Sequence, residues 1–185
     1  MLYTRKGDNG TTKTFGCDQR ISKSSIIAEA LGALDETNSF LGVVRAKTNG
    51  IVFKIGNGEI KFADTILEVQ QNLFIVQAEV AGATLFVSSE KVNRVEKVVD
   101  EIEKVLPPIK TFFISGATEI GAIFDFARTL ARRAERRVVA AHEEGKIKIS
   151  PETLSYLNRL SSLLYALARI SSHSEGAEEI KPDYQ

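Results

Sequence analysis

Arginines recur at helical spacing over residues 124–141. Arg128, Arg132, Glu135 and Arg136 follow one another at steps of four, three and one, so they share one stripe of a predicted helix. Every basic residue in this stretch is Arg, whose planar guanidinium group suits phosphate and carboxylate groups. The stripe indicates either a site for a phosphate-bearing ligand or a salt-bridged surface helix, and this stretch alone leaves both interpretations open.

A second group of candidate residues lies in the polar, turn-rich segment 3–23. The sequence Asp-Asn-Gly at 8–10 marks a tight turn, in which Gly10 can take a positive φ. Exposed N–H groups in such a turn, with Thr hydroxyls and basic side chains nearby, can hold a phosphate group. The segment has no Walker A motif, and an ordinary surface turn is the alternative interpretation.

Single polar and aromatic residues mark three further places. Asp35 and Asn38 lie beside the apolar seam of a helix predicted from about residue 24 to 47, which suggests an interfacial polar cluster or a device that fixes helix register. Asn158 interrupts a Leu-rich helix and needs partners there. Phe112 and Phe113 alternate, so one of them is expected to point away from the core, as a lid or as simple packing.

The elements that must position these residues are helical. Apolar periodicity predicts helices over about 24–47, 60–83 and 88–106, the last stopped by two prolines, and over about 118–141 and 151–171. Residues 50–58 are expected to form a loop with a short extended stretch, and 110–118 is a short β-favouring run. The prediction is a single all-α domain over 1–185. It comprises an N-terminal segment 1–23, a five-helix bundle 24–172 and a flexible acidic tail 173–185.

The amino-acid composition argues against several classes of function. Lys and Arg together number 24, as do Asp and Glu, and this balance argues against a nucleic-acid or anionic-membrane binder. Cys17 is the only cysteine, so neither an intrachain disulfide nor a cysteine-based zinc site is expected. No apolar leader and no run of roughly 18 apolar residues occur, so we expect a soluble, cytoplasmic protein.

Three stretches together resemble one family, the PduO-type ATP:cob(I)alamin adenosyltransferases. They are YTRKGDNGTT near the N-terminus, EALGALDETNSFLG in the first helix, and the pair ARTLARRAERRVV and LNRLSSLLYALAR. The resemblance covers residues 3–46 and 107–170. The chain departs from the family pattern at Ile114-Ser115-Gly116-Ala117, where Leu-Pro-Gly-Gly is common, and at Phe124-Asp125, where Leu-His is common.

The resemblance implies a homotrimer of five-helix bundles, with active sites in the clefts between subunits. ATP and Mg²⁺ would bind there, and a reduced corrinoid, cob(I)alamin, would attack the ribose C5′ of ATP to give adenosylcobalamin and triphosphate. The nucleotide site would comprise Thr4, Arg5, Lys6, Gly7, Thr12, Lys13, Lys23, Arg132, Glu135, Arg136 and Asn158. No residue is assigned as a metal ligand.

On the corrinoid side, the resemblance implies a salt bridge between Asp35 and Arg128 across the subunit interface. Phe112 matches the aromatic residue that displaces the lower axial ligand of cobalt. A cobalamin reductase and an adenosylcobalamin-dependent enzyme are the partners that such an enzyme would need. The alternatives are a non-catalytic ATP- or corrinoid-binding sensor or carrier, a nucleic-acid binder, and a purely structural bundle.

Overall fold

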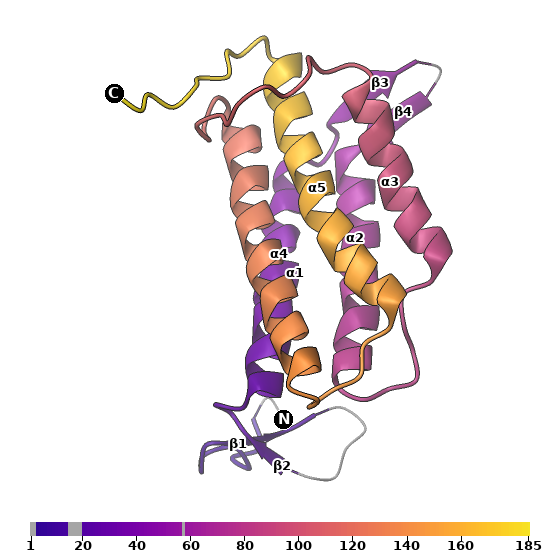
Figure 1. The fold of residues 1–185 in the computed structure, drawn as a ribbon, viewed down its shortest axis with the longest axis vertical. Coiled ribbons are helices and arrows are strands. Elements are labelled where there is room, and N and C mark those ends of the chain that lie inside the picture. Colours follow the sequence, from indigo (N-terminus) through magenta and orange to yellow (C-terminus); the bar gives the residue numbers. More distant parts are fainter. Residues whose placement is uncertain (1–2, 15–19, 57) are drawn as a thin grey trace.

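A computed structural model describes residues 3–14, 20–56 and 58–185. Five helices in these ranges form a bundle (Figure 1). They are α1 (Ile26–Lys47), α2 (Phe62–Val80), α3 (Ser89–Glu103), α4 (Glu119–Glu143) and α5 (Pro151–Ser174). Two antiparallel hairpins accompany them: β1 (Thr11–Lys13) with β2 (Arg20–Ser22), and β3 (Val52–Ile55) with β4 (Gly58–Lys61). The predicted all-α, five-helix bundle is therefore confirmed, with the hairpins as small additions.

The bundle is organised around α4 and α5. Helix α5 packs against α4 and α3, and α1 packs against α4 and α2. The β1–β2 hairpin lies below one end of the bundle, and the β3–β4 hairpin lies near the other end (Figure 1). The N-terminal segment and the loop before α4 are consequently at opposite ends of the molecule.

Side-chain caps fix where three of the helices begin. The hydroxyl oxygens of Ser25, Thr118 and Ser150 accept hydrogen bonds from backbone N–H groups in the first turns of α1, α4 and α5. The helix starts predicted near residues 118 and 151 are thus confirmed. Glu79 at the end of α2 reinforces the start of α5, because its carboxylate accepts the backbone N–H of Ser150 at 2.6 Å and the hydroxyl of Thr153 at 2.5 Å.

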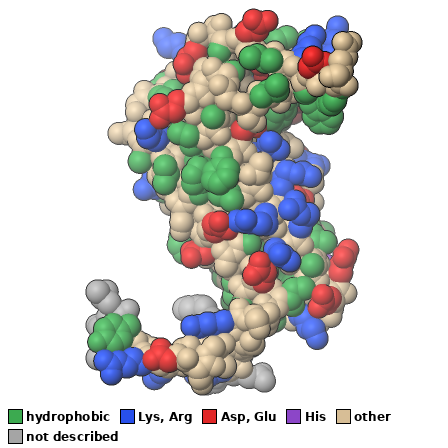
Figure 2. All heavy atoms as spheres, turned by 90° about the vertical axis from the view of Figure 1, so that its left-hand side faces the viewer, with side chains coloured by type: hydrophobic (Ala, Val, Ile, Leu, Met, Phe, Trp, Pro, Cys, Tyr) green, Lys and Arg blue, Asp and Glu red, His purple; other side chains and the backbone are tan. Residues whose placement is uncertain are grey.

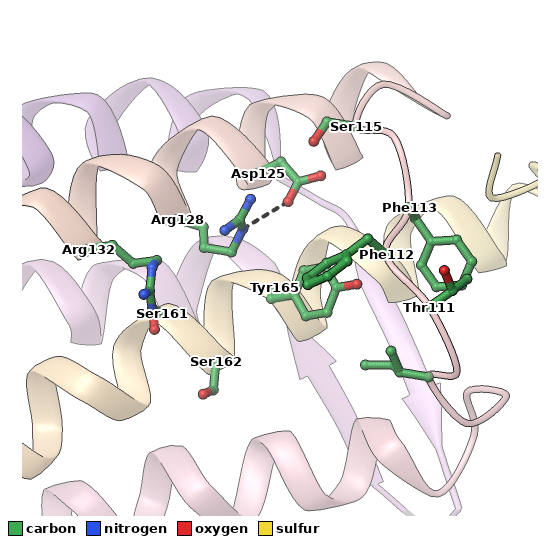
Figure 3. A pocket seen from close by; sticks show the side chains of 11 residues that line it. Thr111, Phe112, Phe113, Ser115, Asp125, Arg128, Arg132, Ser161, Ser162 and Tyr165 are labelled. Carbon is green, nitrogen blue, oxygen red and sulfur yellow. Dashed lines mark hydrogen bonds and ion pairs between the residues drawn. The ribbon is translucent and has the colours of Figure 1, made fainter. Parts of the chain in front are cut away.

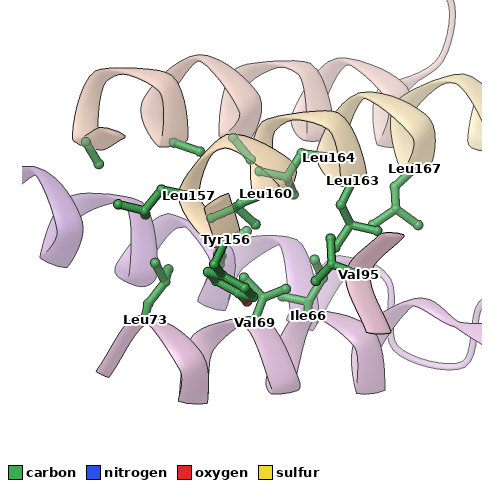
Figure 4. Close-up of a cluster of buried hydrophobic side chains, with 14 of the residues drawn as sticks. Ile66, Val69, Leu73, Val95, Tyr156, Leu157, Leu160, Leu163, Leu164 and Leu167 are labelled. Atoms are coloured by element: carbon green, nitrogen blue, oxygen red, sulfur yellow. The ribbon is translucent and has the colours of Figure 1, made fainter. Parts of the chain in front are cut away.

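The core between α2, α3 and α5 is aliphatic with one satisfied polar cluster (Figure 4). Tyr156 is fully buried there, and burial raises the pKa of its hydroxyl. Asn72 Nδ2 donates to this hydroxyl at 3.2 Å, and Lys91 Nζ donates to Asn72 Oδ1 at 2.6 Å. These bonds satisfy the buried polar groups without opening the apolar core to water.

One prediction about extended structure was confirmed and one was wrong. The short extended stretch expected within 50–58 is strand β3, which pairs with β4 and places Phe53 opposite Ile60. The β-favouring run 110–118 forms no strand. The N–H of Ile114 donates to the carbonyl of Ile180 at 2.8 Å, but this single bond does not build a strand ladder.

Several predicted boundaries also differ. Helix α3 ends at Glu103 and not at Leu106, which precedes Pro107 and is therefore disfavoured in helical geometry. Helix α5 continues to Ser174, beyond the predicted start of the tail, and Glu179 in the tail is paired with Arg169.

Asn38 is buried, but its Oδ1 has no hydrogen-bond partner among the described residues, so the polar cluster expected there is incomplete within one chain.

The close approach of α4 to α5 yields a test. A Cβ at Gly121 would lie 2.5 Å from Ser172 Oγ and 3.2 Å from the carbonyl oxygen of Ala168. We expect Gly121→Ala to destabilise the protein by about 1–3 kcal/mol, because α4 has to move away from α5. Urea unfolding measures the change in the free energy of unfolding.

Gly42→Ala is the matched control, because its new Cβ would meet only Gln70 Nε2, at an ordinary 3.7 Å. This substitution should leave stability unchanged or raise it by up to about 1 kcal/mol, since Ala favours helix over Gly. Equal losses in both variants would contradict the packing argument.

Candidate functional site

A cavity of about 640 Å³ opens between the 109–115 segment and helices α4 and α5. Three predicted site residues line it: Phe112, Arg128 and Arg132. Figure 3 shows both arginines projecting from α4 toward α5, with Phe112 on the loop at the far side. The other lining residues are Ile109, Thr111, Phe113, Ser115, Asp125, Ser161, Ser162 and Tyr165. The structure therefore joins an apolar wall and a cationic wall in one cavity.

Arg128 is held in a fixed pose. Its Nε donates to Asp125 Oδ1 one helical turn earlier, at 3.0 Å, and its guanidinium carbon lies 5.7 Å from the centre of the Tyr165 ring. Burial raises the pKa of the Tyr165 hydroxyl, which favours its neutral form. The aromatic ring and the carboxylate together orient Arg128 at the wall of the cavity.

The arginines of α4 divide into two groups. Arg133 and Arg137 form ion pairs with Glu36 and Glu29 of α1. By contrast, neither Arg132 nor Arg136 forms an ion pair or hydrogen bond with any described residue, and both side chains are exposed. Figure 2 shows Lys and Arg side chains gathered midway along this side of the molecule. The salt-bridged interpretation thus describes Arg133 and Arg137, whereas Arg132 at the cavity and Arg136 one turn further along α4 are available to an anion.

Glu135 and Asn158 come together, as a shared site requires. Asn158 Nδ2 donates to Glu135 Oε1 at 3.1 Å, and this bond joins α4 to α5. Arg159 extends the network, because its Nη1 donates to Asn158 Oδ1 at 2.9 Å and its Nε to Glu96 Oε1 at 2.7 Å. The amide of Asn158 is consequently oriented from both sides.

The N-terminal candidates gather around the β1–β2 hairpin. Arg20 secures this segment: its Nε donates to Thr11 Oγ1 at 2.6 Å, and its Nη2 donates to the carbonyl of Thr11 at 2.8 Å and to that of Lys6. Lys23 lies over Gly7, where an added Cβ would come within 3.2 Å of Lys23 Nζ. The predicted residues gathered here are Thr4, Arg5, Lys6, Gly7, Thr12, Lys13 and Lys23.

Backbone conformation supports a binding role for this segment. Gly10 has a φ of 77°, as predicted for the tight turn. Arg5 has a φ of 58°, which is unusual for a residue with a Cβ and stores strain that often marks ligand-binding loops. Cys17 lies outside the described residues.

Some of the predicted site residues lie apart from one another within one chain. The β1–β2 hairpin lies at the lower end of the bundle and the Phe112 loop at the upper end (Figure 1). Asp35 is exposed on α1 and forms no hydrogen bond or ion pair with a described residue, while Arg128 is paired with Asp125 instead. Because the expected Asp35–Arg128 bridge runs between subunits, it stays a prediction.

Sequence reasoning missed several cavity residues. Asp125 was noted only as a departure from the family pattern, and Tyr165 and Ser161 were not singled out. A signal for the last two was present, since Asn158, Ser161 and Tyr165 follow one another at steps of three and four in a Leu-rich helix. A polar stripe of this kind on α5 indicates a face that borders a site.

Two features are absent from the described ranges. No helix there is long and apolar enough to cross a membrane. No group of three or more His, Cys, Asp and Glu side chains lies close enough together to hold a metal ion.

Comparison with known proteins gives a consistent picture. The model of the family described as cobalamin adenosyltransferase matches residues 2–171. The corrinoid adenosyltransferase PduO of Citrobacter freundii is 37% identical over 180 residues, which are 93% of this chain and 50% of the relative. The chain thus spans about half the length of that relative. The corrinoid adenosyltransferase of Mycobacterium leprae is 33% identical over 182 residues, covering 92% of this chain and 91% of the relative.

A solved structure agrees in fold over nearly the whole chain. It is a variant of the PduO-type ATP:corrinoid adenosyltransferase from Lactobacillus reuteri, complexed with cobalamin and ATP. The TM-score is 0.85 at 27% sequence identity, over 98% of this chain and 99% of the other.

The two arginine groups of α4 differ in a testable way. We expect Arg132→Gln to weaken binding of inorganic triphosphate by about tenfold or more, since a hydrogen bond to a charged group contributes about 1.5–3 kcal/mol. Arg133→Gln should change this affinity by less than about twofold, because the Arg133 side chain is already paired with Glu36 of α1. Isothermal titration calorimetry measures both affinities, and equal losses would contradict the division of the arginines.

Proposed function

The chain belongs to the cobalamin adenosyltransferase family, and from this premise we propose that it transfers the 5′-deoxyadenosyl group of ATP to the cobalt of a reduced corrinoid. The products are adenosylcobalamin (coenzyme B12) and triphosphate. The observation that carries the proposal is the cavity in which the free guanidinium of Arg132 lies beside an apolar wall that includes Phe112.

The cationic side of the site suits the leaving group. The bond between C5′ and the α-phosphate oxygen breaks as the carbon–cobalt bond forms, and the charge that develops on triphosphate needs donors already in place. Arg132 and Arg136 provide such donors, because no described carboxylate neutralises them. Thr4, Arg5, Lys6, Gly7, Thr12, Lys13 and Lys23 complete this side from the N-terminal segment. Asn158 and Glu135 orient each other at its border.

Mg²⁺ enters with ATP in this proposal. Mg²⁺ usually binds through one or two carboxylates together with substrate phosphates and water, so a dedicated cluster of ligands is not required. Glu135 offers one carboxylate beside Arg132 and Arg136 on α4, which fits this mode of binding.

The apolar side of the site suits the corrinoid. Phe112 is 78% exposed at the cavity, so the free chain presents a large aromatic surface to a ligand. In the proposal, Phe112 packs against the lower face of the corrinoid, excludes water and displaces the lower axial ligand of cobalt. The nucleophile is the substrate's cobalt, so the chain needs no nucleophilic side chain of its own. Its own residues position the two substrates.

A homotrimer would bring the separated parts of the site together. The β1–β2 hairpin lies apart from the Phe112 loop in one chain. The carboxylate of Asp35 forms no ion pair with any described residue. On the α1–α4 side, Phe126 and Val43 are 54% and 50% exposed, which leaves apolar surface for a second copy. In the trimer, Asp35 of one subunit pairs with Arg128 of another beside the corrinoid.

Two further expectations belong to the same proposal. The enzyme would receive its reduced corrinoid from a cobalamin reductase and deliver adenosylcobalamin to an enzyme that depends on it. A cytoplasmic location fits a reaction that consumes ATP and stays a prediction.

The decisive experiment is anaerobic. Purified protein, ATP, Mg²⁺ and chemically reduced cob(I)alamin are mixed, and the visible spectrum is recorded. We expect loss of the cob(I)alamin band and ATP-dependent formation of a light-sensitive alkylcobalamin, with inorganic triphosphate as coproduct. An unchanged spectrum while ATP still binds would contradict the enzyme and favour the non-catalytic sensor or carrier.

Asp35 provides a second prediction. Asp35→Asn should raise the KM for cob(I)alamin or lower kcat by about tenfold or more, because it removes the charge partner of Arg128 at the interface. The KM for ATP should change less than about twofold, since the proposal assigns Asp35 to the corrinoid side of the site.

Glu144→Gln is the matched control, since Glu144 is exposed just beyond α4 and no role is assigned to it. Equal losses on the ATP and corrinoid sides in Asp35→Asn would contradict the assignment. A monomer in sedimentation of the unmodified protein at micromolar concentration would contradict the shared site.

A further inference from the structure

Arg169 near the end of α5 is a buried charge with an unusual set of partners. The residue is 5% exposed. Its Nε donates to Glu179 Oε1 at 2.7 Å and its Nη2 to Glu179 Oε2 at 2.8 Å, so the pair is bidentate. The hydrogen bond to Glu179 raises the pKa of Arg169. A buried guanidinium needs such a partner, and the partner here comes from the segment that follows the last helix.

The same guanidinium also contacts the loop that bears Phe112. Arg169 Nη2 donates to the carbonyl of Pro107 at 3.3 Å, and its guanidinium carbon lies 5.3 Å from the centre of the Phe113 ring. A second tie joins the loop to the tail, since the N–H of Ile114 donates to the carbonyl of Ile180 at 2.8 Å. The loop is thus fastened on both sides of Phe112 to Arg169 and to the tail.

The Phe112 side chain has few contacts of its own. Its side chain is 78% exposed, and no aromatic or cation–π contact with a described residue includes its ring. The place of the ring at the cavity therefore follows from the path of the loop backbone, which the two ties determine.

We propose that Arg169 and Glu179 are positioning residues, which clamp the tail (residues 175–185) onto the 107–116 loop and thereby fix Phe112 at the cavity. The proposal rests on the proposed function for its catalytic consequence, but the clamp itself is a structural claim about this chain. Neither residue lines the cavity of about 640 Å³. Their loss should impair the corrinoid side of the reaction and leave the ATP side intact.

Glu179→Gln tests the clamp with little risk to the fold, because Glu179 lies outside the helices and Gln keeps its shape. Glu178→Gln is the matched control, since Glu178 is exposed and forms no hydrogen bond with a described residue. The first readout is amide hydrogen exchange followed by mass spectrometry. We expect Glu179→Gln to lose protection in peptides that contain Ile114, while α4 peptides and the Glu178→Gln variant behave like the unmodified protein. Unchanged exchange at Ile114 would overturn the clamp.

The second readout is steady-state kinetics with cob(I)alamin and ATP. In Glu179→Gln we expect kcat over KM for cob(I)alamin to fall by about 10- to 100-fold, as a displacement of about 1 Å at a reacting centre can cause. The KM for ATP should stay within about twofold, because the triphosphate donors on α4 do not move. Glu179→Asp, which keeps the charge, should recover part of the loss.

The two readouts separate the inferences. Parallel losses for ATP and cob(I)alamin would overturn the positioning role, since they would point to a general loss of structure. If the unmodified protein transfers no adenosyl group, the proposed function fails, and the exchange experiment still decides whether the clamp exists.

Discussion

The structure depends on how closely α4 packs against two neighbours at once. Its buried residues include Ala127, Ala131 and Ala134, and Gly121 meets α5 directly. Side chains this small let α1 and α5 approach the helix axis from different sides. The exposed surface that remains on the helix carries several arginines, beside Phe126 and Thr129. The packing therefore decides which guanidinium groups meet the acids of α1 and which face the cavity.

This arrangement leaves arginines that are unpaired among the described residues on a chain that carries no net charge. The carboxylates of Glu29 and Glu36 lie where they neutralise Arg137 and Arg133, so they do not neutralise Arg132 or Arg136. Asp125 compensates Arg128 alone and orients it. The local potential at the cavity is thus set by the placement of a few acids, which the overall composition does not reveal.

Much of the fold could be predicted from the sequence, because helix periodicity and capping are local signals. The caps at Thr118 and Ser150 and all five helices belong to this class. The extended stretch within 50–58 was expected, but its pairing with β4 was not, because such short strands show no clear period. The 110–118 run lacked a partner strand that only tertiary structure could supply. Arg128 and Phe112 were expected to be near one site, and the cavity brings them together. The pairing of Arg169 with Glu179 depends on where the tail folds back, which no helical spacing encodes.

The bond between Arg169 and Glu179 also bears on the order in which the molecule is completed. Glu179 follows α5, so during synthesis every helix leaves the ribosome before the residue that fastens the 107–116 loop. Domains generally form from the N-terminal side during translation. A bundle with the α4 and α5 wall of its cavity formed can therefore exist for a time with the Phe112 loop unfastened. Maturation of the site is then a late event, separate from folding of the bundle.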